Sequence, residues 1–488
     1  MKRKFLLNLL LLIFINVLVK PFYVFVIDVN VQSTVGLVEY GLYLSIFNFS
    51  YILGMILDMG TTNFNNRAVA RDESFLSRYF SSMVMLRVTL VFVFMILAYS
   101  LAFFMDYDGR QLKLLGLIGV NQILSSFVLY LRSNISGMLR FVADSIVSVL
   151  DKLILIILCI IIFYTPILNH RFNIEWFIYA QTISYVVTGL VALVIVLRIS
   201  GKIVSTINVK LLARMLKLCL PYALLSLLML CYNKIDVVLL KQLIGGEAGN
   251  EQVGIYGRSI RILDAMSNFS YLFSTLLLPI YAKMLKNNEK TVPITKTAAG
   301  LLVVFSFAVA STSFFYGNDI MQLLYHEHNM AESVSVFKIM MFSLPGISLS
   351  YVFGTLLTAN GSMKLLNILS LAGVVVNVGL NLLLIPRFGA IGTACTGVFT
   401  QLLMVVLQVL FAAKIIESKG EKFPARYMAA ITGFIVMVFV VGYFVTMVNA
   451  SPMVRISLHL TMVLVMAVIL KILDIQAALS QIKFRRQP

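Results

Sequence analysis

Long apolar runs separated by short polar breaks occupy almost the whole of this sequence. Crossing the roughly 30 Å hydrocarbon core of a bilayer takes about 20 apolar residues in a helix, and many of the runs reach that length. Because no water satisfies backbone N–H and C=O groups in lipid, a run of this kind must form an α-helix. The pattern therefore predicts an all-α polytopic membrane protein of about fourteen transmembrane helices. Their approximate limits are 5–27, 36–60, 79–105, 112–137, 141–165, 174–198, 211–244, 253–283, 293–316, 333–359, 364–385, 390–416, 426–446 and 453–474.

The composition excludes a soluble protein of this length. Hydrophobic residues make up 60% of the 488 residues and charged residues 12%, whereas soluble domains have roughly 45–50% apolar and about 25% charged residues. No polar break is as long as the roughly 50 residues that a small folded domain needs, so any function must reside in the helix bundle. We therefore expect a transporter without catalytic residues, cofactor or metal site. The alternative from the enzyme class is an intramembrane glycosyltransferase or polysaccharide polymerase.

The positive charge is distributed unevenly over the breaks. The net charge is +18, from 39 Lys and Arg against 21 Asp and Glu. Breaks rich in cations, such as the one that holds Arg67 and Arg71, alternate with breaks that hold acids, such as Glu247 and Glu251. Cytoplasmic loops of membrane proteins carry the excess of Lys and Arg. The alternation thus predicts that both termini are cytoplasmic and that 475–488 form a basic tail, and it leaves no need for a nucleic-acid partner.

A weak internal repeat relates the second predicted helix to the eighth. Tyr-Gly at Tyr40 precedes Asn-Phe-Ser-Tyr at Asn48, and both motifs recur from Tyr256 and Asn268. An Ile-Asp-Val motif precedes each copy. Six helices separate the two copies, so they run in the same direction, as in transporters built from two similar halves. We predict an N-terminal lobe at 1–200, a C-terminal lobe at 211–416 and two additional transmembrane helices at 426–474.

Six cations lie inside predicted helices, away from both sets of loops. They are Lys20, Arg87, Lys152, Lys234, Arg258 and Arg261. A charge at mid-bilayer costs at least roughly 2.5–3.5 kcal/mol, so such a group faces a water-filled cavity or a partner. Because Arg offers a fork that fits phosphate oxygens, the excess of cations predicts an anionic substrate. These six residues are our candidates for substrate binding.

Acids close to these cations leave a structural alternative open. Arg261 could pair with Asp264, and Lys234 with Asp236 through a neighbouring helix, so that the pairs fix helix packing only. Asp236 and Asp264 could equally orient the cations or carry a coupling ion. Asp151 precedes Lys152 directly, and neighbouring side chains diverge on a helix, so we expect Lys152 to find its partner elsewhere.

Polar aromatic and amide side chains on the repeat-related helices are candidates for sugar contact. A Tyr ring with its hydroxyl suits sugar stacking, but it suits packing and interfacial anchoring as well. The candidates are Tyr40, Tyr256 and Asn48.

Motifs along most of the chain resemble the Wzx-type polysaccharide flippases of the multidrug/oligosaccharidyl-lipid/polysaccharide superfamily. The matching stretches are Glu39-Tyr40-Gly41-Leu42-Tyr43, Leu57-Asp58-Met59-Gly60, Arg67-Ala68-Val69-Ala70-Arg71, Leu220-Pro221-Tyr222, Asn233 to Leu240, Val253 to Gly257, Arg261-Ile262-Leu263-Asp264, Asn377 to Asn381, and Ile385 to Ala394.

This resemblance implies a MATE-like fold of two six-helix lobes with two extra C-terminal helices, working by alternating access. It further implies the flipping of undecaprenyl-pyrophosphate-linked oligosaccharide across the bacterial inner membrane for O-antigen or capsule synthesis, with a proton or sodium ion as the coupling ion. Membrane lipids, a polysaccharide polymerase and chain-length machinery are the implied partners. The alternatives are a MATE-type multidrug or cation antiporter, for which we expect an acidic cavity, and a peptidoglycan lipid-precursor flippase.

Overall fold

A computed structural model describes residue 19 and residues 21–72, 74–165, 172–201, 209–326, 330–418 and 420–472. All regular structure in these ranges is helical. Eleven helices among the described residues are long and apolar enough to cross a membrane. The prediction of an all-α polytopic membrane protein is therefore confirmed. The predicted helix 5–27 lies largely outside the described residues, and the predicted tail 475–488 lies wholly outside them.

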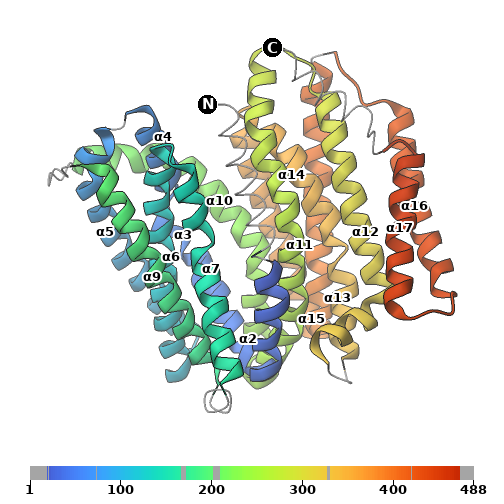
Figure 1. Ribbon diagram of the computed structural model, residues 1–488, viewed down its shortest axis with the longest axis horizontal. Coiled ribbons are helices and arrows are strands. Elements are labelled where there is room, and N and C mark those ends of the chain that lie inside the picture. The colour runs from blue at the N-terminus through green and yellow to red at the C-terminus, as the bar shows by residue number, and fades with distance from the viewer. Residues whose placement is uncertain are drawn as a thin grey trace. The chain divides into compact units, whose positions relative to one another are not determined.

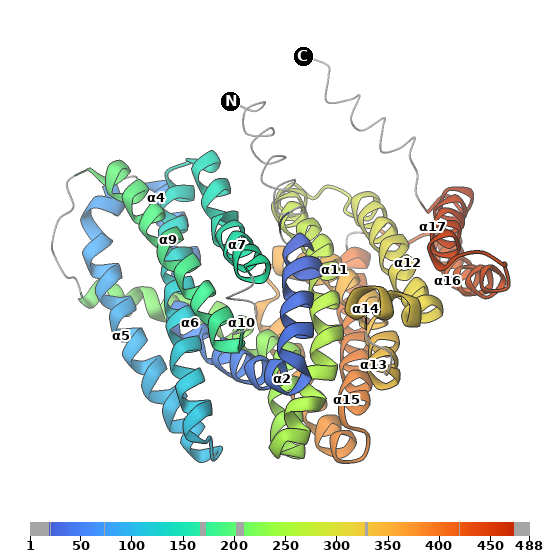
Figure 2. The same cartoon turned by 60° about the horizontal axis from the view of Figure 1, so that its bottom comes forward.

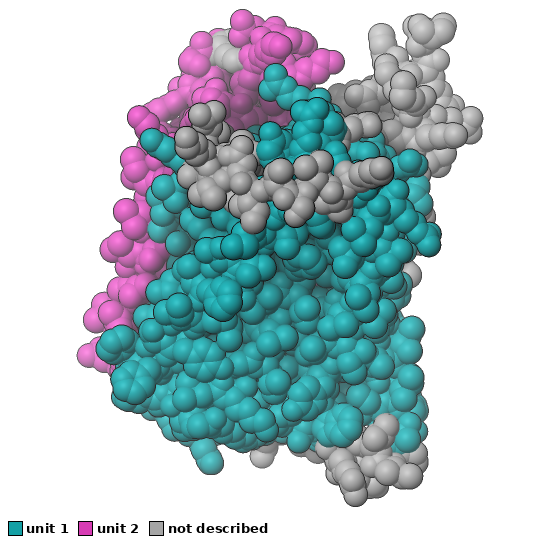
Figure 3. All heavy atoms as spheres, turned by 90° about the vertical axis from the view of Figure 1, so that its left-hand side faces the viewer, with its two compact units in different colours: residues 1–257 teal, residues 258–488 magenta. Residues whose placement is uncertain are grey.

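The chain forms two compact units, residues 1–257 and residues 258–488 (Figure 3). The predicted lobes, 1–200 and 211–416, stay a prediction. Figure 1 labels the helices of both units. Unit 1 contains η1 (Tyr23–Asp28, a π-helix), α2 (Val29–Leu53), α3 (Met55–Asp58), α4 (Thr61–Arg71), α5 (Ser74–Phe104), α6 (Gly109–Gly137), α7 (Phe141–Tyr164), α9 (Ile174–Ser200), α10 (Val209–Ile244) and the first turns of α11 (Gly246–Lys286).

The long helices of unit 1 divide into a lipid-facing and a buried side. On α5, Phe92, Ile96 and Phe103 are exposed, while Phe94 and Ala98 are fully buried. Exposed apolar side chains of this size, in a helix long enough to cross a bilayer, indicate contact with lipid. Packing between helices therefore uses only one side of α5.

Unit 2 contains the rest of α11 together with α12 (Val292–Tyr325), α13 (Ala331–Met340), α14 (Ser343–Ala359), α15 (Met363–Ser418), α16 (Ala425–Thr446) and α17 (Pro452–Ile469). The 56-residue α15 reverses direction within its length (Figure 2). Gly389 has φ 52° and ψ −131°. A Cβ atom on Gly392 would lie 2.7 Å from the carbonyl oxygen of Leu384, although residues eight apart in a straight helix are separated by about 12 Å. The segment is therefore a tight hairpin of two helices, as the runs 364–385 and 390–416 predict.

The C-terminal helices α16 and α17 pack against α12 (Figures 1 and 2). Their shared apolar contact contains Val303 and Val304 of α12, Phe434 and Val438 of α16, and Val463 of α17. At the start of α12, the Glu421 carboxylate accepts hydrogen bonds from the backbone N–H groups of Thr291 (3.0 Å) and Val292 (3.1 Å). The two additional helices are thus fastened to unit 2 by a buried carboxylate as well as by packing.

Candidate functional site

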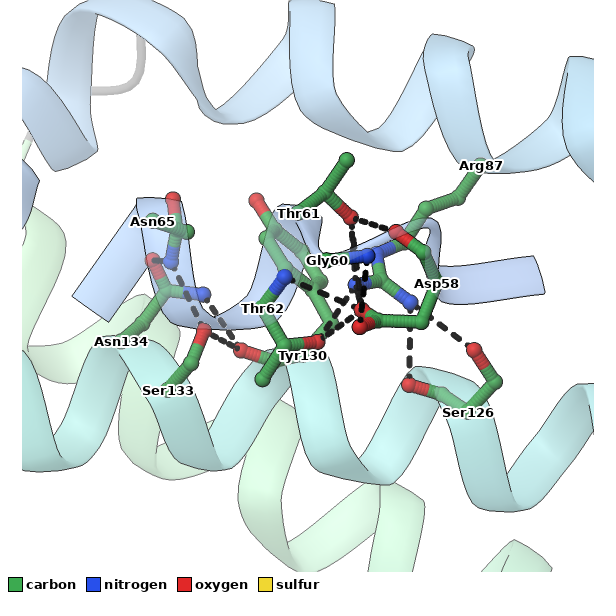
Figure 4. Close-up of polar contacts among 10 residues, drawn as sticks. All are labelled: Asp58, Gly60, Thr61, Thr62, Asn65, Arg87, Ser126, Tyr130, Ser133 and Asn134. Carbon is green, nitrogen blue, oxygen red and sulfur yellow. Dashed lines mark hydrogen bonds and ion pairs between the residues drawn. The ribbon is translucent and has the colours of Figure 1, made fainter. Parts of the chain in front are cut away.

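Arg87 is the centre of a polar network inside unit 1 (Figure 4). Its side chain is 5% exposed, and one terminal nitrogen lies 2.9 Å from Asp58 Oδ1. The other terminal nitrogen donates to Oγ (2.9 Å) and to the carbonyl oxygen (3.1 Å) of Ser126 on α6. The Tyr130 ring lies 4.7 Å from Cζ of Arg87, within cation–π distance. Groups of the same unit therefore contact both terminal nitrogens of this guanidinium.

Asp58 also fixes the start of α4. Met59 (φ 44°) and Gly60 (φ 76°) adopt left-handed backbone conformations, which turn the chain between α3 and α4. Asp58 Oδ1 accepts from the backbone N–H of Thr62 at 3.0 Å, and Oδ2 accepts from that of Gly60 at 3.2 Å. The hydroxyls of Thr61 and Thr62 contact both this carboxylate and the Arg87 nitrogen. Since the first N–H groups of a helix lack partners within it, the carboxylate caps α4.

Amide side chains fasten α4 to α6. Asn65 Nδ2 donates to Ser133 Oγ (2.8 Å) and to Asn134 Oδ1 (2.9 Å), and Asn66 Nδ2 donates to Ser136 Oγ at 3.0 Å. The sequence reasoning named Arg87 but not its partner Asp58, and it did not predict that Thr61–Arg71 form a helix. The sequence signal that could have pointed to Asp58 was the Leu57 to Gly60 motif. Asp58 is the only acid in this motif, and it directly precedes the turn at Met59 and Gly60.

Each copy of the repeat contains a buried hydrogen bond between a tyrosine and an aspartate. In the first copy, the Tyr40 hydroxyl donates to Asp28, at 3.0 Å from Oδ2. In the second, the Tyr256 hydroxyl lies 3.2 Å from Asp236 Oδ2. All four residues belong to unit 1 and are at most 4% exposed. The predicted sugar-contact candidates Tyr40 and Tyr256 thus bind acids of the Ile-Asp-Val motifs, and Asp28 is a buried acid that the sequence reasoning did not name as a site residue.

The two copies meet at glycines. A Cβ atom on Gly41 would lie 1.7 Å from the carbonyl oxygen of Asn250, and one on Gly254 would lie 2.3 Å from that of Leu37. A Cβ atom on Gly257 would lie 3.3 Å from the Tyr40 ring. Because only glycine permits such a close approach of two backbones, α2 crosses the start of α11 at these positions.

Lys152 has its ion-pair partner in the preceding residue. Its Nζ lies 3.4 Å from Asp151 Oδ2, so the expectation that these neighbours could not meet is wrong. The reason is the long flexible lysine stem, which lets the ammonium group fold back toward the acid. The ammonium also lies 5.0 Å from the centre of the Tyr23 ring and 5.7 Å from that of Tyr185.

Arg258 is the most deeply buried of the candidate cations in unit 2. It is 1% exposed, its Cζ lies 4.5 Å from the centre of the Tyr325 ring, and the Tyr325 hydroxyl lies 3.5 Å from its carbonyl oxygen. Arg261 and Asp264 follow on α11 and are half-buried. The Asp264 carbonyl oxygen accepts from Asn268 Nδ2 at 2.8 Å.

The remaining candidate residues lie at separate positions. Lys234 is half-buried on α10, two residues before Asp236. Asn48 donates from Nδ2 to the carbonyl oxygen of Leu44 at 2.8 Å, within its own helix. Lys20 lies outside the described residues. Within unit 1, the structure brings Asp236 and Tyr256 together.

Comparisons with known proteins agree with this architecture. The lipid II flippase MurJ in an inward closed conformation superposes with a TM-score of 0.72 at 14% identity, covering 97% of this chain and 100% of that one. An inward-facing multidrug resistance MATE family transporter of the MOP superfamily gives a TM-score of 0.63 at 16% identity, covering 80% of this chain and 94% of that one. A MOP superfamily transporter from Pyrococcus furiosus, described as having a binding pocket of reverse polarity, gives a TM-score of 0.53 at 17% identity, covering 80% of this chain and 89% of that one.

These structural likenesses show the fold, and the MATE-like fold prediction is confirmed. A search of curated proteins finds no match. The family described as "polysaccharide biosynthesis protein" matches residues 5–285, more than half of the chain. The motifs around the Asp58–Arg87 pair, the Tyr40 helix and the Asp236 helix all lie within the matched region, and the chain belongs to the polysaccharide biosynthesis protein family.

Proposed function

We propose that this membrane protein flips undecaprenyl-pyrophosphate-linked oligosaccharide from the cytoplasmic to the outer leaflet of the bacterial inner membrane. Both termini are cytoplasmic in this proposal, and the cargo passes to a polysaccharide polymerase and its chain-length machinery. Family membership supports a role in polysaccharide biosynthesis, and the fold shared with flippases and transporters supports movement of a substrate rather than catalysis.

The observation that carries the proposal is the placement of Arg258 and Arg261 one turn apart on α11, with Arg258 1% exposed. Sugar hydroxyls and pyrophosphate cannot cross hydrocarbon without polar partners, because burying an uncompensated polar or charged group is costly. Two guanidinium groups on one helix offer charge-assisted hydrogen bonds to phosphate oxygens. A carrier of cationic drugs would instead need acids at this place.

In this proposal Arg258, Arg261, Lys20 and Lys234 bind the pyrophosphate while the bundle alternates between inward-open and outward-open states. Arg87 and Lys152 have a positioning role, because each forms an ion pair within unit 1. Asp236 and Asp264 are the proposed carriers of a coupling proton or sodium ion. Tyr40, Tyr256 and Asn48 act on the sugars only if their present hydrogen bonds exchange during transport.

The test is translocation by the purified protein in liposomes. A fluorescent undecaprenyl-pyrophosphate oligosaccharide is placed in the inner leaflet, and its appearance in the outer leaflet is followed with and without a proton or sodium gradient. We expect protein-dependent translocation, and we expect its loss in the double variant R258Q/R261Q. The double variant R198Q/R426Q removes two exposed arginines and the same net charge, so it should retain translocation.

Two other probes separate the alternatives. Movement of a cationic dye without movement of the lipid-linked sugar would overturn the proposal in favour of a drug antiporter. A peptidoglycan lipid precursor moved in preference to the oligosaccharide would favour the precursor flippase, whose candidacy rests on the fold shared with MurJ over 97% of this chain. Normal translocation by R258Q/R261Q would remove the proposed binding role of these arginines.

A further inference from the structure

The contact between α12 and α17 contains a buried histidine. His459 is 0% exposed, and its Nε2 lies 3.0 Å from Ser311 Oγ. Its ring centre lies 6.2 Å from that of Phe315 and 6.0 Å from that of Tyr316, both on α12. An ionisable ring therefore sits among aromatic side chains, far along the chain from the cations discussed above.

The hydrogen bonds around Ser311 favour one neutral tautomer of His459. Ser311 Oγ lies 3.2 Å from the carbonyl oxygen of Ala308 and donates its only hydrogen there. With that donation the hydroxyl accepts from His459 Nε2, and we assign the proton of the neutral ring to Nε2. Nδ1 is then a bare acceptor, and it has no hydrogen-bond partner among the described residues.

Three other buried polar atoms near this contact also lack a hydrogen-bond partner among the described residues. They are the Thr312 hydroxyl, the Tyr316 hydroxyl and Arg455 Nε. Thr312 and Tyr316 are one turn apart on α12, and Arg455 and His459 are one turn apart on α17. Buried polar atoms are nearly always paired, so this group is an exception that needs an explanation.

Packing leaves the ring little freedom. A Cβ atom on Gly442 of α16 would lie 2.3 Å from the Phe315 ring and 3.0 Å from His459 Cε1. Tyr316, with φ −112° and ψ 17°, interrupts the helical geometry of α12 at the same level. The imidazole of His459, which α17 carries, is thus packed closely between the bend of α12 and Gly442 of α16.

We propose that His459 is a proton-binding site whose protonation loosens the α16–α17 hairpin from the Tyr316 bend of α12. A proton on Nδ1 would place a positive charge among apolar rings, where desolvation disfavours it. Arg455 on α17 is within electrostatic reach of Tyr316, as is Asp319 on α12. Lys338 of α13 lies against Gly317.

The charges near this site do not compensate a protonated His459. Two cations, Arg455 and Lys338, and one acid, Asp319, approach the bend, while α16 brings Gly442 and Phe439 to it. Separation of the hairpin from α12 would admit water and relieve the charge. The neutral ring holds the contact, and the protonated ring opens it.

The test combines two readouts on the full chain in lipid nanodiscs. Carbon-13 labelling of the four histidines gives their protonation and tautomers by NMR between about pH 5 and 8, and His459→Gln assigns the signal. Hydrogen exchange of residues 308–319 and 452–462 is followed over the same range. His459→Gln can still donate to Ser311 but cannot titrate, and His326→Gln, in a loop, is the matched control.

We expect His459 to be the Nε2–H tautomer at neutral pH. As the pH falls through the midpoint of the His459 titration, we expect exchange in both segments, taken relative to the intrinsic rate at each pH, to rise about tenfold. We expect this rise in the unaltered protein and in H326Q, but not in H459Q. An Nδ1–H tautomer, or titration of His459 without a change in exchange, would overturn the proposal. Both readouts come from the unaltered protein, so the proposal stays falsifiable even if H459Q does not fold.

Discussion

At the residue scale, the fold of unit 1 depends on how it satisfies charges in an apolar bundle. Arg87 and Asp58 attract each other at 2.9 Å, but removing two charges from water costs several kcal/mol per ion. The pair is tolerated because hydroxyls, a carbonyl oxygen and the first N–H groups of α4 supply further hydrogen bonds. One acid thus serves both as counter-ion and as helix cap.

Asp58→Asn should destabilise the protein strongly, because it leaves the Arg87 charge buried without its counter-ion. Removing one partner of such a pair typically costs about 3–5 kcal/mol. R87M alone should cost less than D58N, because Asp58 is 25% exposed and water can reach it. Thermal unfolding in detergent measures both. Equal stability of D58N and the unaltered protein would show that the pair does not contribute to the fold.

The two tyrosine–aspartate hydrogen bonds should be energetically coupled pairs. Tyr40→Phe and Tyr256→Phe each remove a hydrogen bond to a buried acid, worth roughly 1.5–3 kcal/mol when the acid is charged. In the double variant Y40F/D28N the loss should be smaller than the sum of the single losses, since both changes remove the same bond. Denaturant unfolding of the four proteins in this cycle gives the coupling energy. Tyr179→Phe, at an exposed position on α9, serves as control, and full additivity would contradict the pairing.

At the element scale, two features outside the hydropathy pattern set the arrangement of helices. Glycines allow α2 and the start of α11 to cross, with the Cβ position of Gly41 1.7 Å from a carbonyl oxygen. The Glu421 carboxylate binds the N–H groups at the start of α12 and so fastens the loop before α16. The glycine crossing and the Glu421 cap are both contacts with backbone atoms. A substitution at Gly41 or Glu421 therefore tests each contact directly.

Gly41→Ala should impair folding, because the new methyl group would overlap the carbonyl oxygen of Asn250 and the two helices would have to separate. Gly433→Ala, on α16, meets nothing within 4 Å and should be neutral or stabilising by up to about 1 kcal/mol through higher helix propensity. The yield of monodisperse protein in size-exclusion chromatography compares the two. A well-folded G41A protein would rule out the close crossing.

Glu421→Gln should weaken the attachment of α16 by about 1 kcal/mol, because a neutral amide is a weaker acceptor for the N–H groups at the start of α12. Glu417→Gln, an exposed position in the last turn of α15, is the matched control and should have no effect. Limited proteolysis of the loop between α15 and α16 provides the measurement. The cap would lose its assigned role if both variants were cleaved at the same rate.

The sequence predicted most helices because lipid permits only one backbone solution for a long apolar run. It predicted the hairpin in α15 from two adjacent runs, and its run 36–60 covers α3. It did not predict α4, whose polar residues Asn65 and Asn66 take their role from contacts with α6. Among the candidate site residues, the sequence predicted cations inside the helices, and their depth in the membrane stays a prediction. It could not supply the partner of Arg87 or Lys152, because those partners depend on turn geometry and side-chain flexibility.

At the scale of the whole molecule, the predicted topology has α11 cross the membrane, and its direction decides which end of the proposed site faces the cytoplasm. Arg258 lies twelve residues after Gly246, the first residue of α11, which corresponds to about 18 Å along the helix axis. If α11 begins at the outer surface, Arg258 lies near the middle of a hydrocarbon core about 30 Å thick. The charge alternation predicts this direction, with Glu247 outside and Lys290 inside.

Cysteine labelling tests this direction. In a chain whose four native cysteines are replaced by serine, Glu247→Cys places a thiol at an exposed position in the first turn of α11, and Lys290→Cys places one at an exposed position just after the helix. A membrane-impermeant maleimide should label E247C in intact cells and K290C only after permeabilisation, because cytoplasmic loops retain the excess of Lys and Arg. Labelling of K290C in intact cells would reverse the topology. Arg258 would still lie near mid-membrane, about 18 Å from the start of α11, but the predicted topology with both termini cytoplasmic would be overturned.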